Sequence, residues 1–340
     1  MNTVSSLLTK DASNMIKGIA VLMMLAHHLW GFPSRVSDLS LASPFVQIGE
    51  SFKICVSIFM FLSGYGLYVT WKKRSCLNVS KRVWNTYKRF WQVFFVVVPI
   101  GILCHGIFFR WDEFIGNMLC LEYDYNHEWW FLGTYIELLV VLSWILRFES
   151  IKAFPCLIVV SAVVLRASAE MLFAHLGGAF YHLFNFGYYY PSFLLGVVFA
   201  KYAWYERLSQ TYAGWKSVAL CVAFVTLSVF IRKIFGATVM TSIMVPAVVY
   251  LFIVMLNRIG RLKCIFCEAG KHSMNMWLVH TFFCYYWLKD VFFSVTRDAF
   301  LAYLVLVFIS CLSSILIDAF WRLIKNGLGV LTERIQKSKM

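Results

Sequence analysis

FLAYLVLVFISCLSSILIDAFW occupies residues 300–321 and contains a single charged side chain, Asp318. In helical conformation a run of this length can cross the hydrocarbon core of a bilayer, which requires about 20 residues. Backbone groups inside lipid find no water, so a spanning segment must satisfy them within a helix. The segment therefore predicts a transmembrane helix.

Similar apolar runs recur along the whole chain. Hydrophobic residues make up 61% of the 340 residues and charged residues 14%, with a mean hydropathy of +0.72. Average proteins have about 45–50% apolar and about 25% charged residues, so the excess apolar surface is expected to face lipid. The sequence predicts an all-α polytopic bundle of about ten transmembrane helices in a single domain, residues 1–340. The other predicted spans are residues 14–32, 50–71, 91–109, 129–146, 154–173, 188–205, 215–231, 239–256 and 273–288.

The formal net charge of +14 is interpreted as a topology signal. Most of the 31 lysines and arginines fall in alternate connections between the predicted spans, beginning with the N-terminal segment. Cytoplasmic connections of membrane proteins are enriched in these residues, so both termini are predicted to be cytoplasmic. The basic residues form short runs and not an arm or a continuous face, so no nucleic-acid partner is expected.

The ten cysteines are scattered, and Cys264 and Cys267 form the only CxxC pair. A zinc site would need a second pair or histidines at matching spacing. Neither is present, so we expect these cysteines to pack in the bundle and expect no metal site.

Ionisable side chains inside spans are candidates for function, because each costs about 2.5–3.5 kcal/mol to insert. Lys17 and His28 are eleven residues apart. At about 100° per residue they share a helix face, about 16 Å apart along the axis, whereas His27 points elsewhere. This face offers a cation for an anionic ligand and, farther across the bilayer, an imidazole able to act as a general base. The alternative is a lysine that snorkels to lipid phosphate and a histidine that hydrogen-bonds a neighbouring helix.

The second span contains Ser63-Gly64-Tyr65-Gly66-Leu67-Tyr68. Its hydroxyls could line a cavity, but glycines in membrane helices also permit close helix packing. A basic loop that includes Lys88 and Arg89 follows. It could hold the phosphates of a cytoplasmic donor, or it could be a topology signal that contacts anionic lipids.

Other intramembrane charges have both structural and functional interpretations. Arg166 and Glu170 are four residues apart, so they can form an ion pair on one helix face or bind an acceptor. Glu137 has no partner at helical spacing, and Lys17 is a candidate by charge.

Toward the ends of the spans, Asp318 and Arg322 are expected to form a structural pair, and His280 a helix-end hydrogen bond. Trp130 belongs to a group of aromatic residues that could stack on a sugar or form an interfacial belt.

Several motifs together resemble the acyltransferase-3 family of membrane acyltransferases over nearly the whole chain. The first-span signature, a basic residue followed after ten positions by histidine, is matched by Lys17 and His28. The SGxxxY signature is matched by FMFLSGYGLY, residues 59–68. Three further stretches are similar to family motifs: EWWFLGTYIELL from Glu128, YYYPSFLLGVVFAKY from Tyr188 and GKHSMNMWLVH from Gly270.

The resemblance implies transfer of an acyl group, usually acetyl from cytoplasmic acetyl-CoA, to a hydroxyl of a cell-surface or lipid-linked glycan. It implies a multi-pass protein of the bacterial cytoplasmic membrane, with acyl-CoA as a co-substrate and no permanently bound cofactor. His28 takes the role of the catalytic histidine, and Lys17 the place usually held by arginine. Ser63, Gly64 and Tyr68 are implied to line the same cavity as His28 and Lys17 and to bind the donor, whereas Lys88 and Arg89 only loosely match the family's basic motif.

Glu137, Arg166, Glu170 and Trp130 are the candidate acceptor-binding residues. Two other classes of protein stay open on the sequence alone. A secondary transporter of a small anionic or sugar-like solute would also carry intramembrane charges, although the two repeated halves typical of such proteins are not apparent. A noncatalytic membrane scaffold would tolerate loss of His28.

Overall fold

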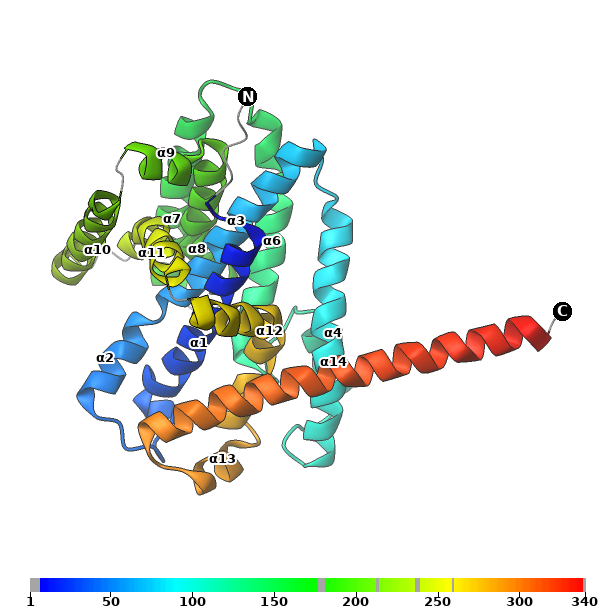
Figure 1. Ribbon diagram of the computed structural model, residues 1–340. Helices are drawn as coiled ribbons and strands as arrows, with labels where there is room; N and C mark the ends of the chain where they lie inside the picture. The colour runs from blue at the N-terminus through cyan, green and yellow to red at the C-terminus, as the bar shows by residue number, and fades with distance from the viewer. Residues whose placement is uncertain (1–6, 177–180, 212–213, 236–238, 259, 339–340) are drawn as a thin grey trace.

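The computed structural model describes residues 7–176, 181–211, 214–235, 239–258 and 260–338. Every regular element within these ranges is helical, as the apolar runs predict (Figure 1). The α-helices are α1 (Lys10–Trp30), α2 (Ser43–Ser51), α3 (Ile54–Arg74), α4 (Val79–Leu103), α5 (Trp111–Met118), α6 (Trp130–Ile145), α7 (Phe154–Leu176), α8 (Tyr181–Lys201), α9 (Trp204–Thr211), α10 (Trp215–Phe235), α11 (Met240–Asn257), α12 (Gly260–Cys284), α13 (Lys289–Val295) and α14 (Ala299–Ser338). Short 3-10 helices are η1 (Pro33–Arg35), η2 (His127–Trp129) and η3 (Leu146–Phe148).

Within the described ranges, 7 helical segments are long and apolar enough to cross a membrane. They are Ser43–Arg74, His127–Phe148, Phe154–His175, His182–Lys201, Trp215–Ile234, Met240–Asn257 and Ala299–Gly327. The chain is therefore a multi-pass membrane protein. The remaining predicted spans correspond to α1, α4 and α12, which have 21, 25 and 25 residues but carry more charged and polar side chains. The ten-span count and the cytoplasmic side of both termini stay predictions.

Helix α4 differs from the expectation, because it begins at Val79, before the predicted span 91–109. The Asn78 side chain caps it by accepting a 2.9 Å hydrogen bond from the backbone N–H of Lys81. Much of the expected basic loop is therefore helical, and Lys88 and Arg89 lie on α4. Lysine and arginine are good helix formers, so a hydropathy criterion places the start of this helix too late.

Helix α1 contacts α2, α3, α11, α12 and α14, and it packs most extensively on α12 (Figure 1). Glycines permit this close approach. A Cβ atom on Gly18 would lie 1.9 Å from the Phe266 carbonyl oxygen, and one on Gly270 would lie 1.8 Å from the Asn14 carbonyl oxygen. Since Gly270 meets Gly18 and His280 meets His28, the two helices run parallel.

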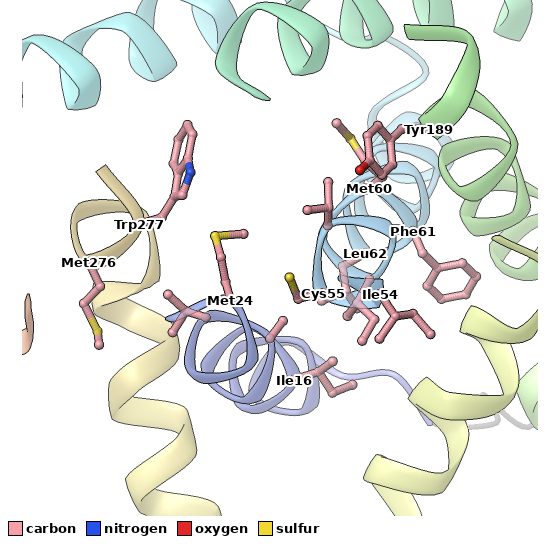
Figure 2. Close-up of a cluster of buried hydrophobic side chains, with 14 of the residues drawn as sticks. Ile16, Met24, Ile54, Cys55, Met60, Phe61, Leu62, Tyr189, Met276 and Trp277 are labelled. Atoms are coloured by element: carbon pink, nitrogen blue, oxygen red, sulfur yellow. The ribbon is translucent and has the colours of Figure 1, made fainter. Parts of the chain in front are cut away.

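A second close contact joins α3 to α8. A Cβ atom on Gly64 would lie 2.0 Å from the Phe193 carbonyl oxygen, and one on Gly196 would lie 2.1 Å from the Phe61 carbonyl oxygen. Buried side chains of α1, α3 and α12, such as Met24, Phe61 and Met276, fill the core around these contacts (Figure 2). The packing interpretation of the second-span glycines therefore describes Gly64 well.

Candidate active site

The parallel packing of α1 and α12 brings two histidines together. His28 Nδ1 lies 2.6 Å from His280 Nε2, and the two ring planes differ by only 4°. His280 is fully buried, whereas His28 is partly accessible. This is hydrogen-bonding geometry between two imidazoles.

For neutral rings, the hydrogen bonds assign both tautomers. His280 Nδ1 lies 2.7 Å from the Trp277 carbonyl oxygen. A carbonyl only accepts, so His280 Nδ1 carries the proton and its Nε2 is an acceptor. His28 Nδ1 must therefore donate to His280 Nε2, and this leaves the lone pair on His28 Nε2. The arrangement prepares His28 Nε2 to act as a base.

The C-terminal end of α1 is held by a further polar network. The Tyr285 hydroxyl donates to the His28 carbonyl oxygen, which is one of the last carbonyls of the helix. The Arg35 guanidinium lies over the Tyr285 ring, 3.6 Å from its centroid, and pairs with Glu128 at 2.6 Å. The Tyr286 hydroxyl donates to the other Glu128 oxygen at 2.8 Å. These contacts fix the position of His28 relative to the start of α6.

His28 opens onto a cavity of about 340 Å³, which we call the His28 cavity. Its walls carry charged, amide and aromatic side chains, and the Trp130 and Tyr189 rings stack there with centroids 5.4 Å apart. The lining residues are His27, His28, Phe32, Arg35, Lys53, Val56, His127, Glu128, Trp130, Phe184, Asn185, Tyr188 and Tyr189. The neighbouring His27 donates from Nδ1 to the Gly49 carbonyl oxygen at 2.7 Å, away from His280.

A second cavity, of about 210 Å³, lies toward the start of α1, and we call it the Lys17 cavity. Its lining residues are Lys17, Met24, Phe59, Ser63, Thr86, Phe131, Leu132, Tyr135, Ser273, Met274 and Trp277. Within the described ranges, no carboxylate lies within ion-pair distance of Lys17. Glu137, for which Lys17 was a candidate partner by charge, forms no ion pair with it and is exposed on α6.

The two cavities follow one another along the same helices. On α6, Trp130 lines the His28 cavity and the next residue, Phe131, lines the Lys17 cavity. On α12, Trp277 lines the Lys17 cavity one turn before His280. The Phe131 and Trp277 rings meet edge to face, with centroids 5.2 Å apart, and Figure 2 shows Met24 and Trp277 projecting from α1 and α12 toward the same side. Phe131 and Trp277 thus form an aromatic wall of the Lys17 cavity within one helical turn of Trp130 and His280.

Of the second-span residues, Ser63 lines the Lys17 cavity, where its hydroxyl donates to the Phe59 carbonyl oxygen at 2.8 Å. Gly64 instead faces α8, and the Tyr68 hydroxyl donates to Glu149 at 2.8 Å. The expectation of one cavity shared by these residues, Lys17 and His28 does not match the structure. Ser63 and Lys17 line one cavity, His28 lines another, and Gly64 and Tyr68 line neither. Their role in donor binding stays a prediction.

Lys88 and Arg89 line a third cavity, of about 810 Å³, between α4, α12 and α14. Arg89 pairs with Asp318 at 2.9 Å. The predicted Asp318–Arg322 ion pair is wrong, because Arg322 Nε reaches only the Asp318 backbone carbonyl, at 3.3 Å. The other lining residues are Asn85, Gln92, Glu268, His272, Ile315, Trp321, Arg322 and Lys325.

Arg166 and Glu170 form the predicted ion pair on α7, at 2.7 Å. Arg166 also donates to the Tyr188 carbonyl oxygen at 3.0 Å and lies over the Tyr188 ring, 3.8 Å from its centroid. Both charged residues line a mainly apolar cavity of about 750 Å³ between α7, α8 and α11, and neither lines the His28 cavity. Among the candidate acceptor-binding residues, Trp130 is the one that lines the His28 cavity.

His280 was expected to form a helix-end hydrogen bond, and Arg35 and Lys53 were not among the candidate site residues. A signal for His280 was present: Gly18 precedes His28, and Gly270 precedes His280, by the same ten residues. Two parallel helices that cross at small residues bring equally spaced positions together. The other two residues lie in short connections whose positions depend on the tertiary fold.

A comparison with protein-family models places these features in context. The model described as an acyltransferase domain, Acyl_transf_3, matches residues 11–319. The chain belongs to the acyltransferase-3 family. Membership confirms the predicted family and supports acyltransferase activity in a membrane protein. Searches of curated proteins and of solved structures gave no match.

Proposed function

We propose that this member of the acyltransferase-3 family is an O-acyltransferase of a bacterial cytoplasmic membrane. It would move an acetyl or other short acyl group from cytoplasmic acyl-CoA to a hydroxyl of a cell-surface or lipid-linked glycan. The observation that supports this best is the oriented His28 imidazole, which lines a cavity next to the one that Lys17 lines. Its unprotonated Nε2 is suited to accept a proton from a hydroxyl bound in the His28 cavity.

The reaction requires a base because a glycan hydroxyl is a poor nucleophile at neutral pH. In the proposed step His28 Nε2 removes the hydroxyl proton as the oxygen bonds to the acyl carbon. The carbon–sulfur bond then breaks, and the departing CoA thiolate takes the proton from His28. His280 accepts the hydrogen bond from His28 Nδ1 throughout, which holds the ring in place and stabilises the transient imidazolium, as the third member of a catalytic triad does.

The donor is proposed to enter through the Lys17 cavity. The Lys17 ammonium has no carboxylate partner among the described residues and is suited to bind a phosphate of CoA. The Ser63 hydroxyl lies in the same cavity, and it could donate to the developing oxyanion by rotating away from the Phe59 carbonyl oxygen. The basic groups of the third cavity, Lys88 and Arg89 among them, are a second candidate site for the CoA phosphates.

The proposal is tested with the purified protein in lipid nanodiscs, radiolabelled acetyl-CoA and membrane glycan acceptors. We expect His28→Ala to abolish label transfer while the protein still inserts and keeps its melting temperature. His175→Ala is the matched control, because His175 is exposed on α7 and lines none of the cavities described above. Undiminished transfer by His28→Ala would overturn the assignment, and a transporter or scaffold would transfer no label at all.

A further inference from the structure

The His28 cavity carries an excess of positive charge. Its lining includes the cations Arg35 and Lys53 and one carboxylate, Glu128. Glu128 is already paired with Arg35 at 2.6 Å and accepts from Tyr286 at 2.8 Å. Lys53 forms no ion pair with any described carboxylate, and its nearest described aromatic contact is the Tyr188 ring, whose centroid lies 5.5 Å from Nζ. Lys53 is exposed and has no counter-ion in the described part of the chain, so its ammonium is available to an anion that enters the cavity.

A second observation concerns Asn185, which lines the same cavity on α8. Its side chain is only 5% exposed, and its Nδ2 has no hydrogen-bond partner among the described residues. A buried amide donor without a partner is unfavourable and is normally satisfied by a protein group, water or a ligand. Asn185 precedes Tyr188 by one helical turn, so it lies on the same side of α8 as the ring that Lys53 approaches.

The rest of the cavity suits a sugar. The stacked Trp130 and Tyr189 rings present aromatic surface to the same space that His28 enters. Aromatic faces bind the apolar side of a sugar ring, while charged and amide donors select its substituents. Lys53 and Asn185 are therefore available to bind an acceptor group other than the hydroxyl that His28 activates.

We propose that the acceptor of this enzyme is an anionic glycosyl unit, whose carboxylate or phosphate oxygens bind the Lys53 ammonium and the Asn185 amide. The inference rests on the proposed acyl transfer and specifies its acceptor class. Binding of the anion at one side of the cavity turns a ring hydroxyl toward His28 Nε2, and a neutral glycan lacks this anchor. The complementary charge favours the anionic unit over a neutral isostere.

Three oligosaccharides of matched length test the proposal: a glucuronic acid oligomer, its carboxyl-reduced glucose counterpart and a phosphorylated glucose oligomer. Binding to the nanodisc protein is followed by tryptophan fluorescence, since Trp130 lines the cavity, and transfer by radiolabelled acetyl-CoA. We expect at least one anionic oligomer to bind about tenfold more tightly than the neutral one, the scale of one charged hydrogen bond. The two anionic arms distinguish carboxylate from phosphate. Equal or absent binding of all three would overturn the proposal.

Variants separate the anion contact from general damage. Lys53→Gln and Asn185→Leu are expected to lower kcat/KM for the anionic acceptor about tenfold, with kcat/KM for the neutral acceptor nearly unchanged. Lys53→Arg should keep the preference, and Lys152→Gln, an exposed lysine outside the cavity, should behave as wild type. An equal loss with both acceptors would reject the anion site. Transfer to neutral acceptors that depends on His28 and is as fast as transfer to anionic ones would reject the anion site and leave the proposed function intact. Absence of His28-dependent transfer to any acceptor would reject the proposed function.

Discussion

His280 Nε2 lies 2.6 Å from His28 Nδ1, and the two histidines occupy corresponding positions on parallel helices. Each follows by ten residues the glycine at which α1 and α12 touch, Gly18 on one helix and Gly270 on the other. The close glycine contact therefore sets the register that brings the imidazoles into hydrogen-bonding distance. The orientation of the proposed base depends on packing that lies about 15 Å away along the helix axes.

The helix contact can be tested with Gly270→Ala. A methyl group there would collide with the Asn14 carbonyl oxygen, 1.8 Å from an ideal Cβ, so α1 and α12 must separate or shift. Overpacking of this kind costs about 1–3 kcal/mol. We expect a lower melting temperature in detergent and a large loss of acyl transfer.

Gly66→Ala is the matched control, because Gly66 on α3 has no atom within 4 Å of an ideal Cβ. Removing a glycine from a helix interior stabilises by about 0.5–1 kcal/mol, so this variant should melt no lower than wild type. Equal melting temperatures and equal acyl transfer in Gly270→Ala and Gly66→Ala would contradict a tight α1–α12 contact.

His280 is a positioning residue in the proposed reaction, since it reaches the acceptor hydroxyl only through His28. His280→Ala removes the acceptor for His28 Nδ1–H, and we expect kcat to fall by about 10²–10⁴-fold, as after loss of a base-orienting group, with little change in either KM. His280→Gln offers an amide oxygen to the same N–H and should restore part of kcat. Steady-state kinetics and melting temperatures of both variants test this prediction. An equal loss of kcat in His280→Ala and His280→Gln would indicate a structural role alone.

The sequence was sufficient for those parts of the fold that depend on composition and local spacing. Apolar runs predicted the helices, and the Lys17–His28 spacing identified α1 as a helix that carries candidate site residues, although the structure places these two residues in different cavities. The partners of these residues were beyond its reach, because the His28–His280 contact joins residues that are 252 positions apart. The Arg89–Asp318 ion pair could not be predicted either, because it depends on how α4 packs against α14.

The polar helices α1, α4 and α12 show why hydropathy is least informative near the site. Their charged residues line cavities, so these helices need less apolar surface than helices surrounded by lipid. Intramembrane ionisable groups are tolerated where they face a cavity or a partner. The helices that carry the candidate chemistry are thus the ones that a hydropathy criterion recognises least well.

Lys17 provides a test of donor binding. Lys17→Met keeps much of the side-chain volume and removes the charge, so a phosphate contact would be lost while packing remains. We expect KM for acyl-CoA to rise about tenfold, with a smaller change in kcat, and the salt dependence of this KM to weaken. Lys17→Arg should retain donor binding. An unaltered dependence of the rate on acyl-CoA concentration in Lys17→Met would exclude the contact.

The last prediction concerns Glu149, which follows η3 and lies outside the spanning segment of α6. A hydrogen bond from Lys201, at 2.5 Å, lowers the pKa of the Glu149 carboxyl below its ordinary value, and the Tyr68 hydroxyl adds to the effect. A carboxyl whose folded-state pKa is lowered stabilises the protein at pH values above its unfolded-state pKa, and the contribution disappears as pH falls through the folded-state pKa. Glu149→Gln should therefore melt lower than wild type at pH 7, and the difference should shrink as the pH falls below about 4.5, the ordinary range of a glutamate.

Melting temperatures of the two proteins in detergent between neutral and acid pH measure this difference. Glu113→Gln is a suitable comparison, because the Arg110–Glu113 contact, at 3.3 Å, is longer than the Lys201–Glu149 contact, and Arg110 is more exposed than Lys201. Its effect should be small at every pH, since exposed ion pairs contribute little. A Glu149→Gln difference that stays constant across the titration would show that the lost stability comes from packing and not from the charge of Glu149.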